Sequence, residues 1–184
     1  MQKDIFMSAT SVIQTRQISE RELLLPRDDV IVSKTDLTGR ITYANRTFCL
    51  ISGFAEAELL GAPHSIVRHP DMPRAVFKLL WDTLCEGREI FAYVKNRSRS
   101  GDYYWVFAHA TPSFNSSGTV IGFHSNRRAP ERKALATIAP VYADVLQEER
   151  KHKNGKAALA AGTTRLMDIV RSKGLTYDEL VFSI

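Results

Sequence analysis

The stretch EIFAYVKNRSRSGDYYWVFAHATPSFNSSGTVIGFHSNR, residues 89–127, decides the fold. It contains three runs rich in β-branched and aromatic residues, which are typical of strands. SRSG separates the first two runs, and FNSSG separates the second from the third. Such Gly- and Ser-rich connections favour tight turns. The stretch therefore predicts three consecutive antiparallel strands.

Upstream, VIVSKTD and RITYAN flank the turn LTG and predict two more strands over residues 30–45. The region between the two strand groups predicts three short helices. Gly53 and Gly61 are expected to end the first two, and the third is expected to run to Gly87 with Asp71 as its N-cap. The order β-β-α-α-α-β-β-β predicts an α+β fold, with a five-stranded antiparallel sheet and short helices on one face.

Both ends of the chain have sequence patterns that are typical of helices. Residues 8–25 predict an N-terminal helix, and helical segments follow Pro130, with Thr176 as the expected N-cap of the last one. We expect an N-terminal helical cap over 1–28, a central α+β domain over 29–129 and a helical extension over 130–184. The extension is either an output or docking element or a set of helices packed on its own domain.

Composition limits the class of protein. The 184 residues are 44% hydrophobic and 24% charged, which favours a packed core over disorder. The net charge of +5 is spread along the chain, so nucleic-acid binding is not expected. No run reaches the ~18 apolar residues of a membrane span, and two cysteines without a signal peptide indicate reduced thiols and a cytoplasmic protein.

Strand alternation predicts which side chains face a pocket beneath the helices. Asn96 shares a face with apolar residues in its strand, and a buried amide needs a partner. In the next strand Ala108 and Ala110 leave room for a flat ligand. The opposite face carries Trp105 and Phe107, so we expect the N-terminal helix or a second protomer to cover it.

Three motifs resemble a known family. ITYANRTFCLISGF, ELLGAPHSIVRHPDMPRAVFKLLWDTLCEG and VKNRSRSGDYYWV are similar to the PAS sensor of bacterial aerotaxis receptors. The resemblance covers about residues 30–128. It implies a PAS fold, non-covalent FAD and redox sensing as a proxy for oxygen. Where this family has tryptophan the chain has Phe91. Aerotaxis receptors continue into a membrane anchor and a coiled coil, whereas the given sequence stops at Ile184; if it is complete, the output machinery is expected in another protein.

The resemblance also implies a cofactor site. Its expected members are Asn45, Arg68, His69, Asp71, Trp81, Phe91 and Asn96. Residue chemistry alone leaves other roles open for several of them. Arg68 and Asp71 could form a turn-stabilising ion pair, His69 could simply pack, and Trp81 could belong to the core. Asn45 is equally suited to capping a helix.

We therefore expect a cytoplasmic redox-sensing PAS protein that binds FAD and no metal. It is expected to transmit the flavin state to a chemotaxis or kinase-type partner. We also expect a homodimer, formed through the terminal helices or the outer sheet face. We expect no enzymatic activity, because no pair of nucleophile and base is evident. The alternatives are a cofactor-free PAS interaction module, a haem-binding gas sensor and a small flavoprotein oxidoreductase.

Overall fold

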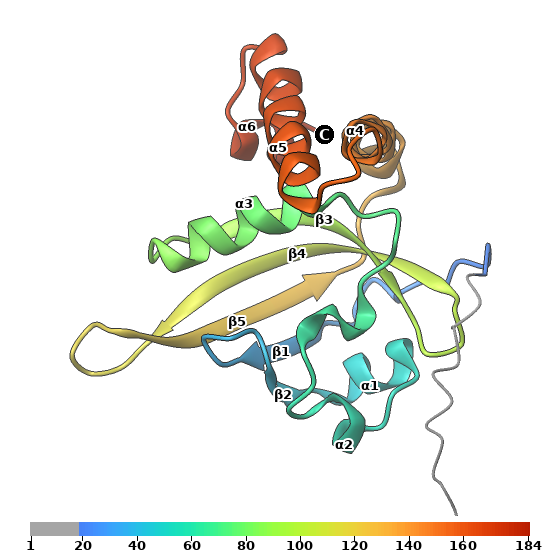
Figure 1. Cartoon of the computed structure of the whole chain (residues 1–184). Helices are drawn as coiled ribbons and strands as arrows, with labels where there is room; N and C mark the ends of the chain where they lie inside the picture. Colours follow the sequence, from blue (N-terminus) through green and yellow to red (C-terminus); the bar gives the residue numbers. More distant parts are fainter. Residues whose placement is uncertain (1–18) are drawn as a thin grey trace, which may run out of the picture.

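The computed structural model describes residues 19–184, and these form an α+β structure around one antiparallel sheet (Figure 1). The five strands lie in the order β2-β1-β5-β4-β3. Their bounds are β1 (Ile31–Thr35), β2 (Ile41–Ala44), β3 (Ile90–Arg97), β4 (Tyr103–Phe114) and β5 (Val120–Arg128). The sheet predicted from the sequence is confirmed. Because β1 pairs with β5, the N-terminal hairpin and the C-terminal strands join into one sheet.

Short helices cover the inner face of this sheet, as predicted. They are α1 (Arg46–Ser52), α2 (Glu56–Leu59), the 3-10 helix η1 (His64–Val67) and the longer α3 (Arg74–Cys85). Gly53 ends α1 with a φ of 70°, a conformation that glycine adopts without steric cost. Because the three helices before α3 are short and irregular, they leave space between α3 and the sheet.

The prediction that Asp71 caps α3 is wrong. The helix begins at Arg74 directly after Pro73, which offers no side-chain cap. The Asp71 carboxylate instead accepts a hydrogen bond from Lys95 of β3 at 2.9 Å. The first turn of α3 takes its acceptors from a residue far along the chain, described below.

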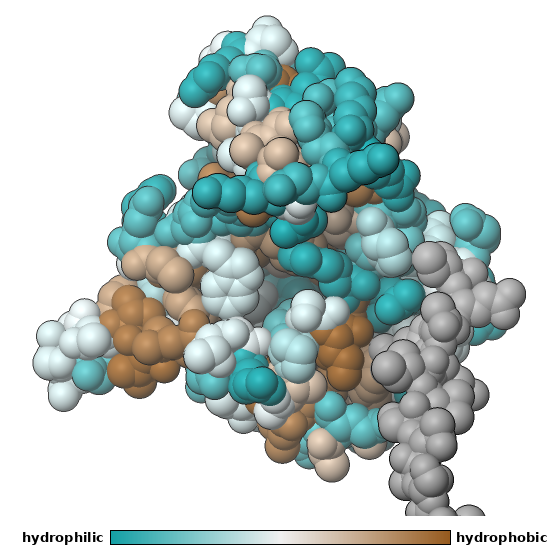
Figure 2. Space-filling view, in the orientation of Figure 1, coloured by the Kyte–Doolittle hydropathy of each residue, from teal (hydrophilic) through white to brown (hydrophobic). Residues whose placement is uncertain are grey.

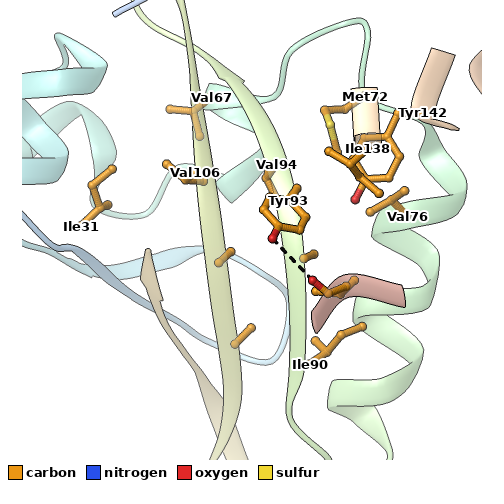
Figure 3. Packing of buried hydrophobic residues seen from close by; sticks show 14 of the residues in the cluster. Ile31, Val67, Met72, Val76, Ile90, Tyr93, Val94, Val106, Ile138 and Tyr142 are labelled. Carbon is orange, nitrogen blue, oxygen red and sulfur yellow. Dashed lines mark hydrogen bonds between the residues drawn. The ribbon is translucent and has the colours of Figure 1, made fainter. Parts of the chain in front are cut away.

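Three helices follow the sheet and pack beside it (Figure 1). They are α4 (Arg132–Arg150), α5 (Gly155–Ser172) and α6 (Tyr177–Ser183), and Thr176 caps α6 as predicted. They share one hydrophobic core with the sheet: Figure 3 shows Tyr93 of β3 and Val76 of α3 near Tyr142 of α4. The helical extension therefore packs on its own domain.

The same helices cover the outer face of β3 and β4. The centre of the Trp105 ring lies 6.4 Å from the centre of the Tyr142 ring. The centre of the Phe107 ring lies 6.2 Å from that of Phe182 in α6. The expectation that an N-terminal helix or a second protomer covers these aromatic residues is therefore corrected, because the C-terminal helices do so. Elsewhere apolar side chains stay exposed, as Figure 2 shows beside the β4–β5 hairpin, where Phe114 and Ile121 lie.

The expected N-terminal helix is only partly testable, because residues 8–18 of it lie outside the described residues. Residues 19–25 are extended rather than helical. Glu22 bridges Tyr103 in parallel, and Leu23 donates its amide to the Tyr103 carbonyl at 2.7 Å. The Glu22 carboxylate also binds Arg132 at the start of α4. Within residues 19–184, no helix is long and apolar enough to span a bilayer.

Candidate functional site

A cavity of about 350 Å³ lies between α3 and the inner face of the sheet. This volume is within the range of sites for small ligands. One wall is the apolar face of α3, and the other is the inner face of β3, β4 and β5. Its main lining residues are His64, Arg68, Phe77, Leu80, Trp81, Leu84, Val94, Asn96, Ala108, Ala110, Phe123 and Arg127.

Small side chains on β4 and a glycine in the β1–β2 turn shape this cavity. Ala108 and Ala110 point inward and leave the space that larger side chains would fill. Trp81 of α3, on the opposite wall, meets Phe123 of β5 edge to face, with ring centres 5.3 Å apart. A Cβ atom on Gly39 would lie 3.0 Å from the Trp81 ring, so the glycine admits the indole. The result is a space with the aromatic rings of Phe77 and Trp81 on the α3 side and the small side chains of Ala108 and Ala110 on the sheet side.

A buried arginine forms the most charged part of the lining. Arg127 is only 2% exposed, donates a hydrogen bond to the Ser33 hydroxyl and lies 4.7 Å from the centre of the Phe48 ring. Among the described residues, no carboxylate forms an ion pair with it, although buried cations are normally paired. Burial lowers the Arg127 pKa to about 10, so the guanidinium still carries its charge at neutral pH.

His64 completes this polar group. Its Nε2 lies 3.1 Å from the Ser33 hydroxyl and 3.3 Å from an Arg127 nitrogen. Burial, and then the charge of Arg127, lowers the His64 pKa to about 3. The ring is therefore neutral at pH 7. Nε2 accepts from Ser33 and Arg127, which places the ring proton on Nδ1.

Arg68 supplies a second cation. Its guanidinium stacks on Phe77, 3.7 Å from the ring centre, and its Nε atom is buried without a partner among the described residues. Burial, and then repulsion from Arg74, lowers the Arg68 pKa. The backbone of Arg68 also bridges Asn96 of β3. The loop before α3 is therefore fixed to the sheet at the position where its arginine lines the cavity.

Asn96 points into the same cavity, as strand alternation predicts. It is 4% exposed, and no described residue hydrogen-bonds its side-chain amide. A buried amide without partners is unfavourable by several kcal/mol in a fully apolar setting. The cavity therefore presents polar groups that a ligand could satisfy.

Of the seven residues expected at the site, Arg68, Trp81 and Asn96 line the cavity, and the others do not. Asn45 caps α1 by accepting from the Phe48 amide and also bonds the backbone of Val30 and Val32. Its side chain thus has the structural role that residue chemistry left open. Phe91 lies on the outer face, stacked on His109 with ring centres 4.2 Å apart.

His69 and Asp71 also lie outside the cavity lining. His69 is buried, and its Nδ1 accepts from the Asp71 amide at 3.1 Å. Burial, and then the charge of Lys95, lowers the His69 pKa to about 4, so the ring is neutral. Although burial opposes it, the hydrogen bond from Lys95 lowers the pKa of the Asp71 carboxyl. Both residues stabilise the loop that carries Arg68.

Sequence reasoning missed Arg127, Ser33 and His64 as a connected group. Alternation along β5 could have indicated Arg127, since it shares a face with Phe123. Neither cysteine lines the cavity. Within residues 19–184, no group of three potential metal ligands is close enough to hold an ion.

The family follows from residues 41–127, which match the model described as PAS fold. This part of the chain belongs to the PAS family. The chain is 41% identical to the aerotaxis receptor of Escherichia coli strain K12 over 125 residues, which are 68% of this chain and 24% of that protein. It is 30% identical to the nitrogen fixation regulatory protein of Klebsiella pneumoniae over 95 residues, which are 52% of this chain and 19% of that protein.

The PAS chain thus spans about a quarter or less of these relatives. Solved structures support the fold. The dark structure of the blue-light photoreceptor aureochrome1 LOV has a TM-score of 0.51 at 21% identity, covering 66% of this chain and 84% of that one. An RNA-binding light-oxygen-voltage receptor has a TM-score of 0.52 at 20% identity, covering 64% of this chain and 33% of that one. The PAS relatives are signalling modules.

Proposed function

We propose that this protein is a cytoplasmic redox sensor that binds FAD non-covalently and passes the flavin state to a signalling partner. One observation carries the proposal: the cavity is lined by the buried Arg127 and the half-buried Arg68, neither of which pairs with a described carboxylate, and by the buried Asn96, whose side-chain amide has no partner among the described residues. The similarity to the aerotaxis receptor over 68% of the chain supports it.

The chemistry of the lining fits a flavin. An isoalloxazine ring is flat, and one edge carries carbonyl and ring-nitrogen acceptors. Trp81 and Phe77 on one wall and Ala108 and Ala110 on the other suit its faces. Arg127 supplies donors for its polar edge. We assign Arg68 to the pyrophosphate, because a guanidinium can hold phosphate oxygens through two parallel hydrogen bonds.

Asn96 is the residue that we assign to reading the redox state. A bound flavin supplies a ring atom that accepts a hydrogen bond when oxidised and donates one when reduced. An asparagine amide can answer this change by rotating half a turn, because one end donates and the other accepts. The backbone of Asn96 is bridged to Arg68. Rotation at Asn96 therefore acts next to the loop that leads into α3.

The output is proposed to reach a chemotaxis or kinase-type protein, and the protein is proposed to form a homodimer. The C-terminal helices already cover the β3 and β4 part of the outer face. A dimer through this face would therefore use β1, β2 and β5, and one through the helices would use their exposed sides.

A haem-binding sensor is the second candidate in this family. Its support is weaker, because Nε2 of His64, the histidine nearest to Arg127, already accepts hydrogen bonds from two neighbours. An iron atom would have to displace both. A cofactor-free interaction module would leave Arg68, Arg127 and Asn96 without ligand partners.

The absorption spectrum of the purified protein tests these functions. We expect the two-banded yellow spectrum of a flavin, and FAD rather than FMN in the chromatogram after denaturation. Arg68→Met is expected to release FAD. Arg128→Met is expected to retain FAD, because Arg128 is an exposed arginine that follows Arg127 in the sequence but does not line the cavity. A Soret band, FMN alone, or a colourless protein that takes up no added FAD would overturn the proposal.

A further inference from the structure

The first turn of α3 obtains its hydrogen-bond acceptors from the C-terminal helices. Helix N-termini leave backbone N–H groups unpaired, and Pro73 cannot cap them with its side chain. The Glu149 carboxylate of α4 fills this role. Its two oxygens accept from the Arg74 amide at 3.0 Å and the Ala75 amide at 2.8 Å.

This contact is buried, so water cannot replace it. Glu149 is 5% exposed and Ala75 is fully buried. A negative charge at a helix N-terminus is favourable, because the helix dipole and the free N–H groups both attract it. A carboxylate that receives charge-assisted hydrogen bonds from two amides is well compensated. Loss of the carboxylate would leave buried donors unpaired.

A second helix holds Glu149 in place. Gly162 of α5 lies against it so closely that a Cβ atom there would be 2.5 Å from the glutamate Cγ. The Arg74 side chain adds a hydrogen bond to the carbonyl of Gly155, the first residue of α5, at 3.1 Å. Helix α5 therefore has a glycine where the buried carboxylate needs room.

The segment that Glu149 holds also forms part of the cavity. Arg68 and Phe77 line the cavity on either side of Arg74 and Ala75, and their side chains stack on each other. The charge of Glu149 also acts on Arg68, where it opposes the lowering of the pKa by burial. A ligand that moves Arg68 or the start of α3 must therefore change the contact with Glu149.

We propose that Glu149 couples the cavity to the C-terminal helices, so that ligand binding at Arg68 and docking of α4 and α5 influence each other. Such coupling is reciprocal, because both events depend on the same contact. The coupling to a ligand rests on the proposed function, whereas the capping role of Glu149 does not. The route thus leads from the loop before α3, through two backbone amides, into α4 and α5.

Hydrogen exchange on the full chain tests the capping role without any ligand. Glu149→Gln is expected to speed exchange at the amides of Arg74 and Ala75 by about tenfold or more, as expected when charge-assisted hydrogen bonds are lost. Glu148→Gln is the matched control, because Glu148 is the neighbouring glutamate and pairs with Lys151 instead. Equal exchange at these amides in wild type and Glu149→Gln would overturn the proposal.

Gly162→Ala gives an independent test with a distinctive sign. Helix propensity alone predicts that alanine slows exchange in α5 by up to about fivefold. The contact with Glu149 predicts the opposite, with faster exchange in α5 and at Ala75, since the new methyl group displaces the carboxylate. Slower exchange at both places would contradict the proposed arrangement.

The final arm compares FAD-loaded protein with protein stripped of FAD. We expect FAD to change exchange in α4 and α5 of wild type and Glu148→Gln, and this difference to vanish in Glu149→Gln. An unchanged difference in Glu149→Gln would overturn the coupling. If no variant binds FAD, the proposed function fails, and the ligand-free exchange data decide the role of Glu149.

Discussion

Replacing Arg127 by methionine should stabilise the ligand-free protein. The fall of the Arg127 pKa from 12.5 to about 10 corresponds to about 3 kcal/mol, since each pKa unit is worth about 1.4 kcal/mol. The folded state binds this proton less tightly than the unfolded state. The full destabilisation is therefore present below pH 10, and it disappears as the pH rises towards 12.5.

Methionine fills a similar volume without charge, and the change also removes favourable contacts. The hydrogen bonds to Ser33 and His64 are worth about 1 kcal/mol each, and the contact with the Phe48 ring adds a fraction of that. We therefore expect Arg127→Met to raise the free energy of unfolding by about 1 kcal/mol. An anionic or strongly accepting ligand should bind the variant less tightly, because the cation that attracts it is gone.

Urea unfolding of the ligand-free protein at pH 7.5 measures the first effect, and FAD titration measures the second. Arg128→Met is the control, because Arg128 is the next residue and is exposed. Its stability should stay within about 0.5 kcal/mol of wild type. If Arg127→Met lowers stability by more than about 1 kcal/mol, the contacts of the arginine outweigh its desolvation, and the reasoning is refuted.

Three further outcomes follow from the described contacts. Asn96→Asp should either lose FAD or keep it without a redox-dependent change in limited proteolysis; a cleavage difference equal to that of wild type excludes Asn96 as the switch. His64→Asn should weaken the loss of stability between pH 6 and 4, because the folded-state pKa of about 3 means that the unfolded state binds the proton first. Free energies of unfolding from urea titrations across this range should fall with a slope shallower by up to about 1.4 kcal/mol per pH unit. Removal of residues 131–184 should abolish cooperative unfolding by uncovering Trp105 and the start of α3; an unchanged melting temperature would contradict this.

Local patterns predicted the sheet and most helix ends. Alternation along β3 correctly placed Asn96 on the inner face, and Gly53 and Thr176 marked a helix end and a helix start. These features depend on residues close in the sequence, so their signals survive without tertiary context. The same local logic made Asp71 the expected cap of α3 and failed, because the acceptor comes from Glu149.

The cavity was harder to predict than the sheet. Arg127 is charged, and charged residues are almost never fully buried unless paired, so sequence reasoning did not place it inside. Phe91 was expected near the cofactor through the resemblance, yet strand alternation puts it on the outer face with Phe182. Partners separated by tens of residues decide such positions, and no local pattern reveals them.

The remote acceptor of α3 limits how this protein can be recombined with others. A chimera that joined residues 29–129 to a foreign effector would lose Glu149 and leave two amides of the sensor unpaired. Such a fusion should keep α4 and α5, or carry a repair such as Pro73→Ser, which restores a local side-chain acceptor at the start of α3. The suitable point for exchange lies after α6, whose Phe182 covers Phe107, rather than at the end of the sheet.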